Sequence, residues 1–202
     1  PFLRIDTPTL AAASAVGILK QEPDHHNSKQ IIGQLLESDD PARLCTTIGF
    51  FLQSGHLLAK ESVLRFLDHP SYQVRNEILA VLDPHHDVDF LDPIIKTLAY
   101  ATTFDHANAA LNHYDPSLIL DRFTYFLFAT DSSIHLKLGI LKTAHEFSSD
   151  DMTELLSSGL DDPDLLILDG ISVALVKISK IHELDQTVLD AIEIHIESIS
   201  QL

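Results

Sequence analysis

Two His-Glu pairs are the residues of this sequence whose types and spacing come closest to metal chemistry. His145-Glu146 and His182-Glu183 each stand near the end of a segment with helical apolar spacing. An imidazole beside a carboxylate is a suitable ligand set for iron with open coordination positions. A His near a helix C-terminus also fits a structural role, because it interacts with free carbonyls and the negative end of the helix dipole. We expect this structural role and no metal site, and keep His145, Glu146, His182 and Glu183 as the candidate metal ligands.

Other potential ligands are adjacent to one another in the sequence rather than spaced for chelation. His25-His26 and His85-His86 are neighbours, and successive side chains on a helix point about 100° apart. Both pairs fall in turn-like segments beside Asp. The Asp-rich segment 150–164 lacks the spacing and the final Glu of a calcium-binding loop. We therefore expect solvated loop histidines and capped helix starts at these places.

The remaining catalytic motifs are missing from the sequence. It has no Gly-rich phosphate loop, no G-x-S-x-G and no H-E-x-x-H. Cys45 is the single cysteine, which excludes an internal disulfide and a Cys-based metal cluster, and its apolar helical context predicts a buried thiol. The sequence thus predicts no catalytic residue, no cofactor and no enzymatic activity.

The charge is strongly acidic and unevenly spread. The chain has 13 Lys and Arg against 30 Asp and Glu, a net charge of −17. Residues 1–100 carry a net charge of −5 and residues 101–202 a net charge of −12. Nucleic-acid binding needs a basic surface that displaces counterions, so we expect no nucleic-acid partner. The acidic charge serves solubility, or it forms an acidic face for a basic partner.

No stretch of the sequence predicts a membrane span, because none reaches 18 uncharged apolar residues. We expect a cytoplasmic location and no direct membrane insertion. Residues 8–19 have an apolar core but no basic region before them, so they are interpreted as a first helix. The chain starts at Pro1, from which we expect a processed chain or a piece of a larger protein with adjoining domains.

Apolar spacing follows the helical period along nearly the whole chain. Gly is scarce, with 7 residues, and 45% of the residues are hydrophobic. Two segments place apolar residues on one helical stripe: Val74, Ile78, Leu79 and Leu82, and then Leu165, Leu168, Ile171, Leu175 and Ile178. Residues 192–198 alternate as a strand would, but their flanks are helical, so we predict a helix there.

Helix breaks recur about every 30 residues and share their chemistry. They lie at 37–41, 68–71, 101–105, 129–133 and 160–163, and they are rich in Asp, Ser, Thr and Pro, which cap and start helices. Shorter breaks divide each unit into two helices. The predicted helices are 8–20, 28–37, 41–54, 57–68, 71–82, 88–101, 104–113, 116–129, 132–147, 150–159, 163–180 and 185–200. One hairpin cannot bury its apolar face alone, so the pattern predicts a stack of hairpins.

The helix junctions carry a family resemblance. Residues 39–44 (DDPARL) and 70–79 (PSYQVRNEIL) resemble the start of the first helix in bacterial HEAT repeats, and residues 162–165 (DPDL) repeat the opening without the Arg. The resemblance covers most of residues 30–180. It implies an all-α fold, a right-handed α-α superhelix of the HEAT or armadillo type. We expect five to six helical hairpins in one domain, residues 1–202.

Two narrower resemblances imply different functions. Residues 109–118, 160–179 and 188–198 are similar to the soluble HEAT region attached to bacterial transporters of the nucleotide-translocase type. This implies a cytosolic domain tethered to a membrane protein. The His-Glu pairs resemble those of deoxyhypusine hydroxylases, HEAT-like enzymes that hold two irons. That family has four such motifs, and this chain has two.

Aromatic residues suggest where a partner would dock. Phe123 and Phe126 share a helix face, while Tyr125 and Phe128 point elsewhere, so this helix is either buried between neighbours or carries an exposed aromatic patch. The sequence favours a non-catalytic interaction, scaffold or regulatory module that binds a protein or peptide. The transporter domain and the metal-dependent hydroxylase stay open as alternatives.

Overall fold

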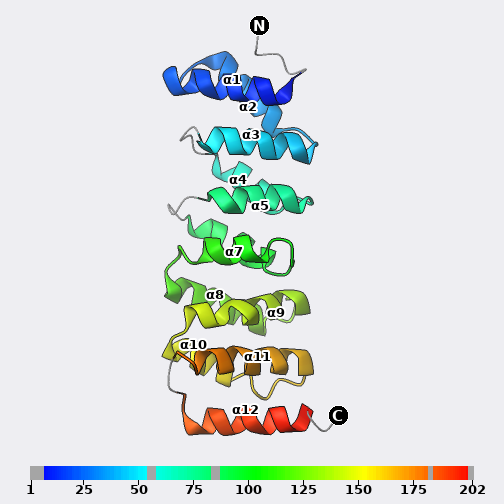
Figure 1. Ribbon diagram of the computed structural model, residues 1–202, viewed down its shortest axis with the longest axis vertical. Coiled ribbons are helices and arrows are strands. Elements are labelled where there is room, and N and C mark those ends of the chain that lie inside the picture. Colours follow the sequence, from blue (N-terminus) through cyan, green and yellow to red (C-terminus); the bar gives the residue numbers. More distant parts are fainter. Residues whose placement is uncertain (1–6, 54–57, 83–86, 182–183, 200–202) are drawn as a thin grey trace. The chain divides into compact units, whose positions relative to one another are not determined.

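The computed structural model describes residues 7–53, 58–82, 87–181 and 184–199 of the chain. Over these residues the chain forms twelve α-helices, two short 3-10 helices and no strand (Figure 1). The all-α prediction is thereby confirmed. The chain divides into two compact units, residues 1–94 and 95–202. The single domain over residues 1–202 stays a prediction.

The first unit is built from helical hairpins. Its helices are α1 (Pro8–Gln21), α2 (His26–Leu36), α3 (Pro41–Gln53), α4 (Lys60–Leu67) and α5 (Tyr72–Val81), followed by the 3-10 helix η1 (Val88–Phe90) and the start of α6 (Leu91–Thr97). Helix α3 packs against α1 on one side and α5 on the other, so these three helices form a row (Figure 1). Helix α2 packs against α1 and α3, and α4 packs against α5.

Small side chains let the first hairpin close tightly. Ala11, Ala12 and Ala15 of α1 have no exposed surface, and they lie beside the larger apolar residues of α1 and α2. One cluster joins Ala15, Val16 and Leu19 to Ile32, and a second joins Ala11 and Ala12 to Leu35. Phe50 of α3 packs against both clusters, so the apolar side of this hairpin is covered by the next helix of the row.

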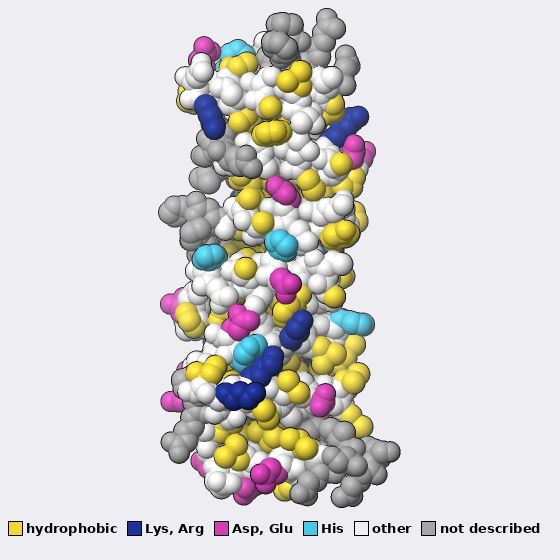
Figure 2. Space-filling model, in the orientation of Figure 1, with side chains coloured by type: hydrophobic (Ala, Val, Ile, Leu, Met, Phe, Trp, Pro, Cys, Tyr) yellow, Lys and Arg dark blue, Asp and Glu magenta, His cyan; other side chains and the backbone are white. Residues whose placement is uncertain are grey.

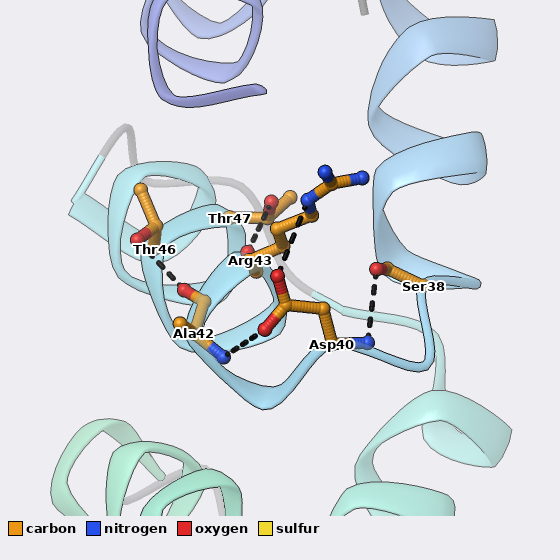
Figure 3. A network of polar contacts seen from close by, with 6 residues as sticks. All are labelled: Ser38, Asp40, Ala42, Arg43, Thr46 and Thr47. Carbon is orange, nitrogen blue, oxygen red and sulfur yellow. Dashed lines mark hydrogen bonds and ion pairs between the residues drawn. The ribbon is translucent and has the colours of Figure 1, made fainter. Parts of the chain in front are cut away.

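The start of α3 shows how an Asp-Pro junction begins a helix (Figure 3). Asp40 precedes Pro41, and its carboxylate accepts a hydrogen bond from the backbone N–H of Ala42 at 3.0 Å. The same carboxylate pairs with Nε of Arg43 at 3.3 Å. The N–H of Asp40 itself donates to Oγ of Ser38 at 3.2 Å. Side chains thus satisfy groups that the first helical turn leaves free.

The second unit repeats the hairpin arrangement. After the end of α6 it contains α7 (Phe104–Leu111), α8 (Pro116–Phe128), α9 (Ile134–Thr143), the 3-10 helix η2 (Ala144–Phe147), α10 (Asp150–Ser157), α11 (Leu165–Ile178) and α12 (Gln186–Ile199). Helix α9 packs against α11, and α8 packs against α10. Contacts of α8 with α9 and of α10 with α11 join the two rows.

Close packing at two points fixes α9 and η2 in this unit. Phe123 of α8 and Phe147 of η2 meet edge to face, with ring centroids 5.9 Å apart. A Cβ on Gly139 of α9 would lie 2.8 Å from the carbonyl carbon of Leu98. Only a residue without a side chain allows this approach of α9 to the backbone that follows α6.

The capping chemistry of the junctions is confirmed at several helix starts. The side chains of Asp115, Ser133, Ser149 and Asp164 each accept a hydrogen bond from a backbone N–H in the first turn of the following helix. Residues 192–198 are helical within α12, as predicted. The capping residues therefore set where these helices begin.

Two predicted helices end four residues earlier than expected. The segment 88–101 starts with η1, and α6 ends at Thr97 because the hydroxyl of Thr103 donates to the Thr97 carbonyl at 2.6 Å. Bonds of the 3-10 type, such as Tyr100 N–H to Thr97 O, follow this end. The segment 132–147 is α-helical only to Thr143 and then tightens into η2.

The apolar stripe of α11 was predicted wrongly at one residue. Ile171, Leu175 and Ile178 are buried, but Leu165 is 62% exposed and Ile167 is buried in its place. A spacing of three residues turns by 300°, so the steps from Leu165 to Ile171 drift about 60° each around the helix. Leu165 therefore lies on the outer side of the first turn.

Candidate functional site

Glu146 of the first His-Glu pair joins two helices. Its carboxylate accepts a hydrogen bond from the amide of Asn108 in α7 at 2.6 Å and from the amide of Asn112, just after α7, at 3.4 Å. The side-chain oxygen Oδ1 of Asn108 in turn accepts a hydrogen bond from the hydroxyl of Thr143 at the end of α9. These contacts give Glu146 a structural role that connects α7 to η2.

His145 is half-buried beside this network. Its Nδ1 is shielded from solvent and has no hydrogen-bond partner within the described residues. His182 and Glu183, the second candidate pair, lie outside the described residues. Within the described ranges, no group of three or more His, Cys, Asp or Glu side chains lies close enough to hold a metal ion. A metal site made of both His-Glu pairs therefore stays a hypothesis.

Two other histidines bind backbone N–H groups close to them in the sequence. Nδ1 of His25 accepts from the N–H of Ser28 at 3.2 Å and so caps the start of α2. Nδ1 of His69 accepts from the N–H of Ser71 at 3.0 Å, before α5. We expected His25 to be a solvated loop residue, and capping by a histidine has no familiar sequence signal. The pair His85-His86 lies outside the described residues.

A cluster of opposite charges joins α4 to η1. Nζ of Lys60 lies 2.7 Å from Asp87 and also pairs with Asp89. Hydrogen bonds to Asp87 and Asp89 raise the pKa of Lys60. The Lys60 ammonium and then the N–H of Asp89 lower the pKa of Asp87. These two pKa shifts keep Lys60 and Asp87 charged at neutral pH. Each of the three side chains is already paired, so the cluster holds two elements together.

Cys45 is a poor nucleophile. Its apolar context predicted a buried thiol, but Cys45 lies only half-buried in α3. Burial, and then the negative charge of Glu77, raise the pKa of its thiol. The thiolate is the reactive form of cysteine, so both effects reduce reactivity.

Helix α8 divides its aromatic residues between core and surface. Phe123 and Phe126 are buried, as their shared face predicted, whereas Tyr125 is 53% exposed and Phe128 is 57% exposed. Leu118 is also exposed on this helix and lies about two turns before Tyr125. The guanidinium of Arg122 lies over the Tyr125 ring at 4.8 Å. The exposed aromatic patch, one of the two alternatives, is thus present.

Helix α11 carries a second exposed apolar stripe. Leu165, Leu166, Val173 and Val176 are exposed, and helical spacing puts them on one side together with Asp169 and Lys180. Hydrophobic and basic side chains, coloured alike for Lys and Arg, lie close together at the level of α11 in Figure 2. The charges on this side of α11 are mixed in sign, because Asp169 and Lys180 are both exposed there.

Comparison with protein-family models gives no match for the chain, and comparison with curated proteins gives none either. Among the helices of the described residues, none is long and apolar enough to cross a membrane.

Proposed function

We propose that this chain is a HEAT-like α-solenoid that acts as a non-catalytic interaction module, a scaffold or regulatory element that binds a protein or peptide. The proposal combines the repeated hairpins with the apolar side chains that they leave exposed. It assigns no reaction to the chain and no cofactor.

The solenoid part of the proposal is supported by the packing inside each unit. Both units contain a row of neighbouring helices drawn from successive hairpins, α1, α3 and α5 in the first unit and α9 and α11 in the second. Junctions of the same chemistry recur through both units at about the same spacing. Within a unit, packing of this kind lets a hairpin cover the apolar side of its neighbour, as in a HEAT-like repeat.

The binding part is supported most by the exposed aromatic side chains of α8. Tyr125 and Phe128 expose more than half of their surface, although burial of aromatic rings is strongly favoured. Aromatic residues are enriched at the centres of protein interfaces. Their position on the outer side of a helix fits contact with a partner better than a role in the core.

Selection of peptides from a phage-displayed random library against the immobilised full chain tests this function. We expect enrichment of a related set of peptides that compete with one another, and hydrogen exchange should locate them on one continuous surface of helices. The control is an unrelated protein of similar negative charge. Enrichment no greater than on that control would contradict the proposed function.

A further inference from the structure

The outer side of α8 and α10 combines exposed apolar residues with acidic residues. The two helices are neighbours, and they turn their other sides to α9 and α11. The exposed residues of α10 are acidic, with Asp150, Asp151 and Glu154 opposite the buried Met152 and Leu156. We call this surface the α8–α10 face; it comprises Leu118, Asp121, Arg122, Tyr125 and Phe128 of α8 and Asp150, Asp151 and Glu154 of α10.

Charge on and around this face is almost entirely negative. Asp115, before α8, and Asp131, after it, are also exposed. Within residues 115–131 and 149–158 the sequence has six Asp and Glu and one basic residue, Arg122. Arg122 lies over the rings of Tyr125 and Phe126, at 4.8 and 5.7 Å. The face therefore presents apolar anchors together with exposed carboxylates on the same helix and on its neighbour.

The exposed apolar residues and the exposed carboxylates together indicate the class of partner. Resting on the proposed function, we propose that the α8–α10 face binds a basic amphipathic segment of a partner protein. The apolar side chains of that segment contact Leu118, Tyr125 and Phe128, and its Lys and Arg side chains pair with the surrounding carboxylates.

A second copy of the chain is a poorer occupant of this face. Two copies would bring together surfaces of the same sign, in a chain of net charge −17, and like charges across an interface are unfavourable. The exposed stripe of α11 does not favour a basic partner in this way, because both Asp and Lys residues lie beside it.

Fluorescence anisotropy with the full chain tests the proposal. The probe is a labelled amphipathic peptide of Leu and Lys, about five helical turns long. We expect Tyr125→Ser with Phe128→Ser to weaken binding at least about tenfold, because aromatic anchors dominate interface energies. Reversing charge with Asp151→Lys and Glu154→Lys should weaken binding several-fold and flatten its dependence on salt, since fewer charge pairs are screened.

Matched controls separate this face from a general attraction to an acidic protein. Leu166→Ser with Val173→Ser removes exposed apolar residues of α11 and should leave binding unchanged. A peptide of the same composition, with its leucines spread around the helix, should bind weakly, as should a Leu-Glu peptide. Circular dichroism checks that the variants are folded. The charge-reversal pair tests the face independently if the aromatic pair unfolds.

Several outcomes would overturn the inference. Equal binding by the Tyr125/Phe128 variant and by the original chain would do so, as would loss of binding in the α11 variant alone. A dimer in sedimentation that dissociates when Tyr125 and Phe128 are changed would assign the face to a second copy. If the display selection yields peptides that bind elsewhere, the proposed function stands and this inference fails.

Discussion

At the scale of single residues, several charged side chains hold elements in place. Glu146 joins α7 to η2 through two amides, and Lys60 joins α4 to η1 through two carboxylates. The distances between these partners in the sequence run from 27 to 38 residues, about one hairpin. Such contacts depend on neighbouring hairpins meeting, so the sequence alone could not pair these residues.

The charge cluster around Lys60 makes a prediction about pH. The pKa of Asp87 is lowered from 3.8, so its contribution to stability is present above that pH and is lost as the pH falls through the lowered value. The pKa of Lys60 is raised from 10.5, so its contribution is present below that pH and is lost as the pH rises through the raised value.

Lys60→Met should move the pKa of Asp87 up towards 3.8, because the hydrogen bond from Lys60 is the largest cause of the lowered pKa. The pKa should stay somewhat low, since the N–H of Asp89 still donates to the carboxylate. Carboxyl chemical shifts followed by NMR titration measure the change. Asp115 is the internal control, because Ser117 lowers its pKa and Lys60 is not involved. An Asp87 titration that does not move would contradict the ion pair.

Gly139 predicts a loss of stability from the smallest possible side chain. Gly139→Ala places a Cβ against the backbone carbonyl of Leu98, which cannot move aside as a flexible side chain could. We expect destabilisation by about 1–3 kcal/mol in urea unfolding.

Gly33→Ala is the matched control for this substitution. Gly33 lies in α2 with nothing within 4 Å of its added Cβ, so alanine should stabilise by about 0.5–1 kcal/mol through helix propensity. Destabilisation of equal size at both positions would contradict the packing account of Gly139.

At the scale of helices, the sequence predicted existence and order well because caps and apolar spacing are local signals. The predicted range 116–129 compares with α8 at Pro116–Phe128, and 150–159 compares with α10 at Asp150–Ser157. The end of α6 was missed, because the Thr103 hydroxyl that binds the Thr97 carbonyl is six residues away. No local pattern marks such a bond.

Capping energy can be measured with two serines at equivalent positions. Oγ of Ser133 accepts a hydrogen bond from the N–H of Leu136 at the start of α9, whereas Ser71, at the start of α5, makes no side-chain capping bond. Ser133→Ala should cost about 1 kcal/mol in urea unfolding followed by circular dichroism. Ser71→Ala should cost clearly less. Similar losses from both substitutions would refute the assigned role of Ser133.

At the scale of the whole molecule, the sequence predicted helical hairpins, but it predicted only in part which side chains lie on the surface. Spacing correctly separated Phe123 and Phe126 from Tyr125 and Phe128, but it left open whether the second pair was covered by a neighbouring helix. The net charge indicated an acidic face without locating it. Packing of α8 beside α10 brings the aromatic and acidic residues together. The two helices are separated in the sequence by α9 and η2, so no local pattern predicts this contact.

Small-angle X-ray scattering of the purified full chain tests the proposed continuous stack of hairpins. Five to six hairpins spaced about 10 Å apart form a rod about 60 Å long, for which we expect a radius of gyration of about 20 Å. A compact globular domain of this length would give about 16–17 Å. A value near 20 Å with the pair-distance distribution of a rod is the predicted result. A value near 16 Å with a symmetric distribution would contradict the solenoid and the binding surface proposed on it.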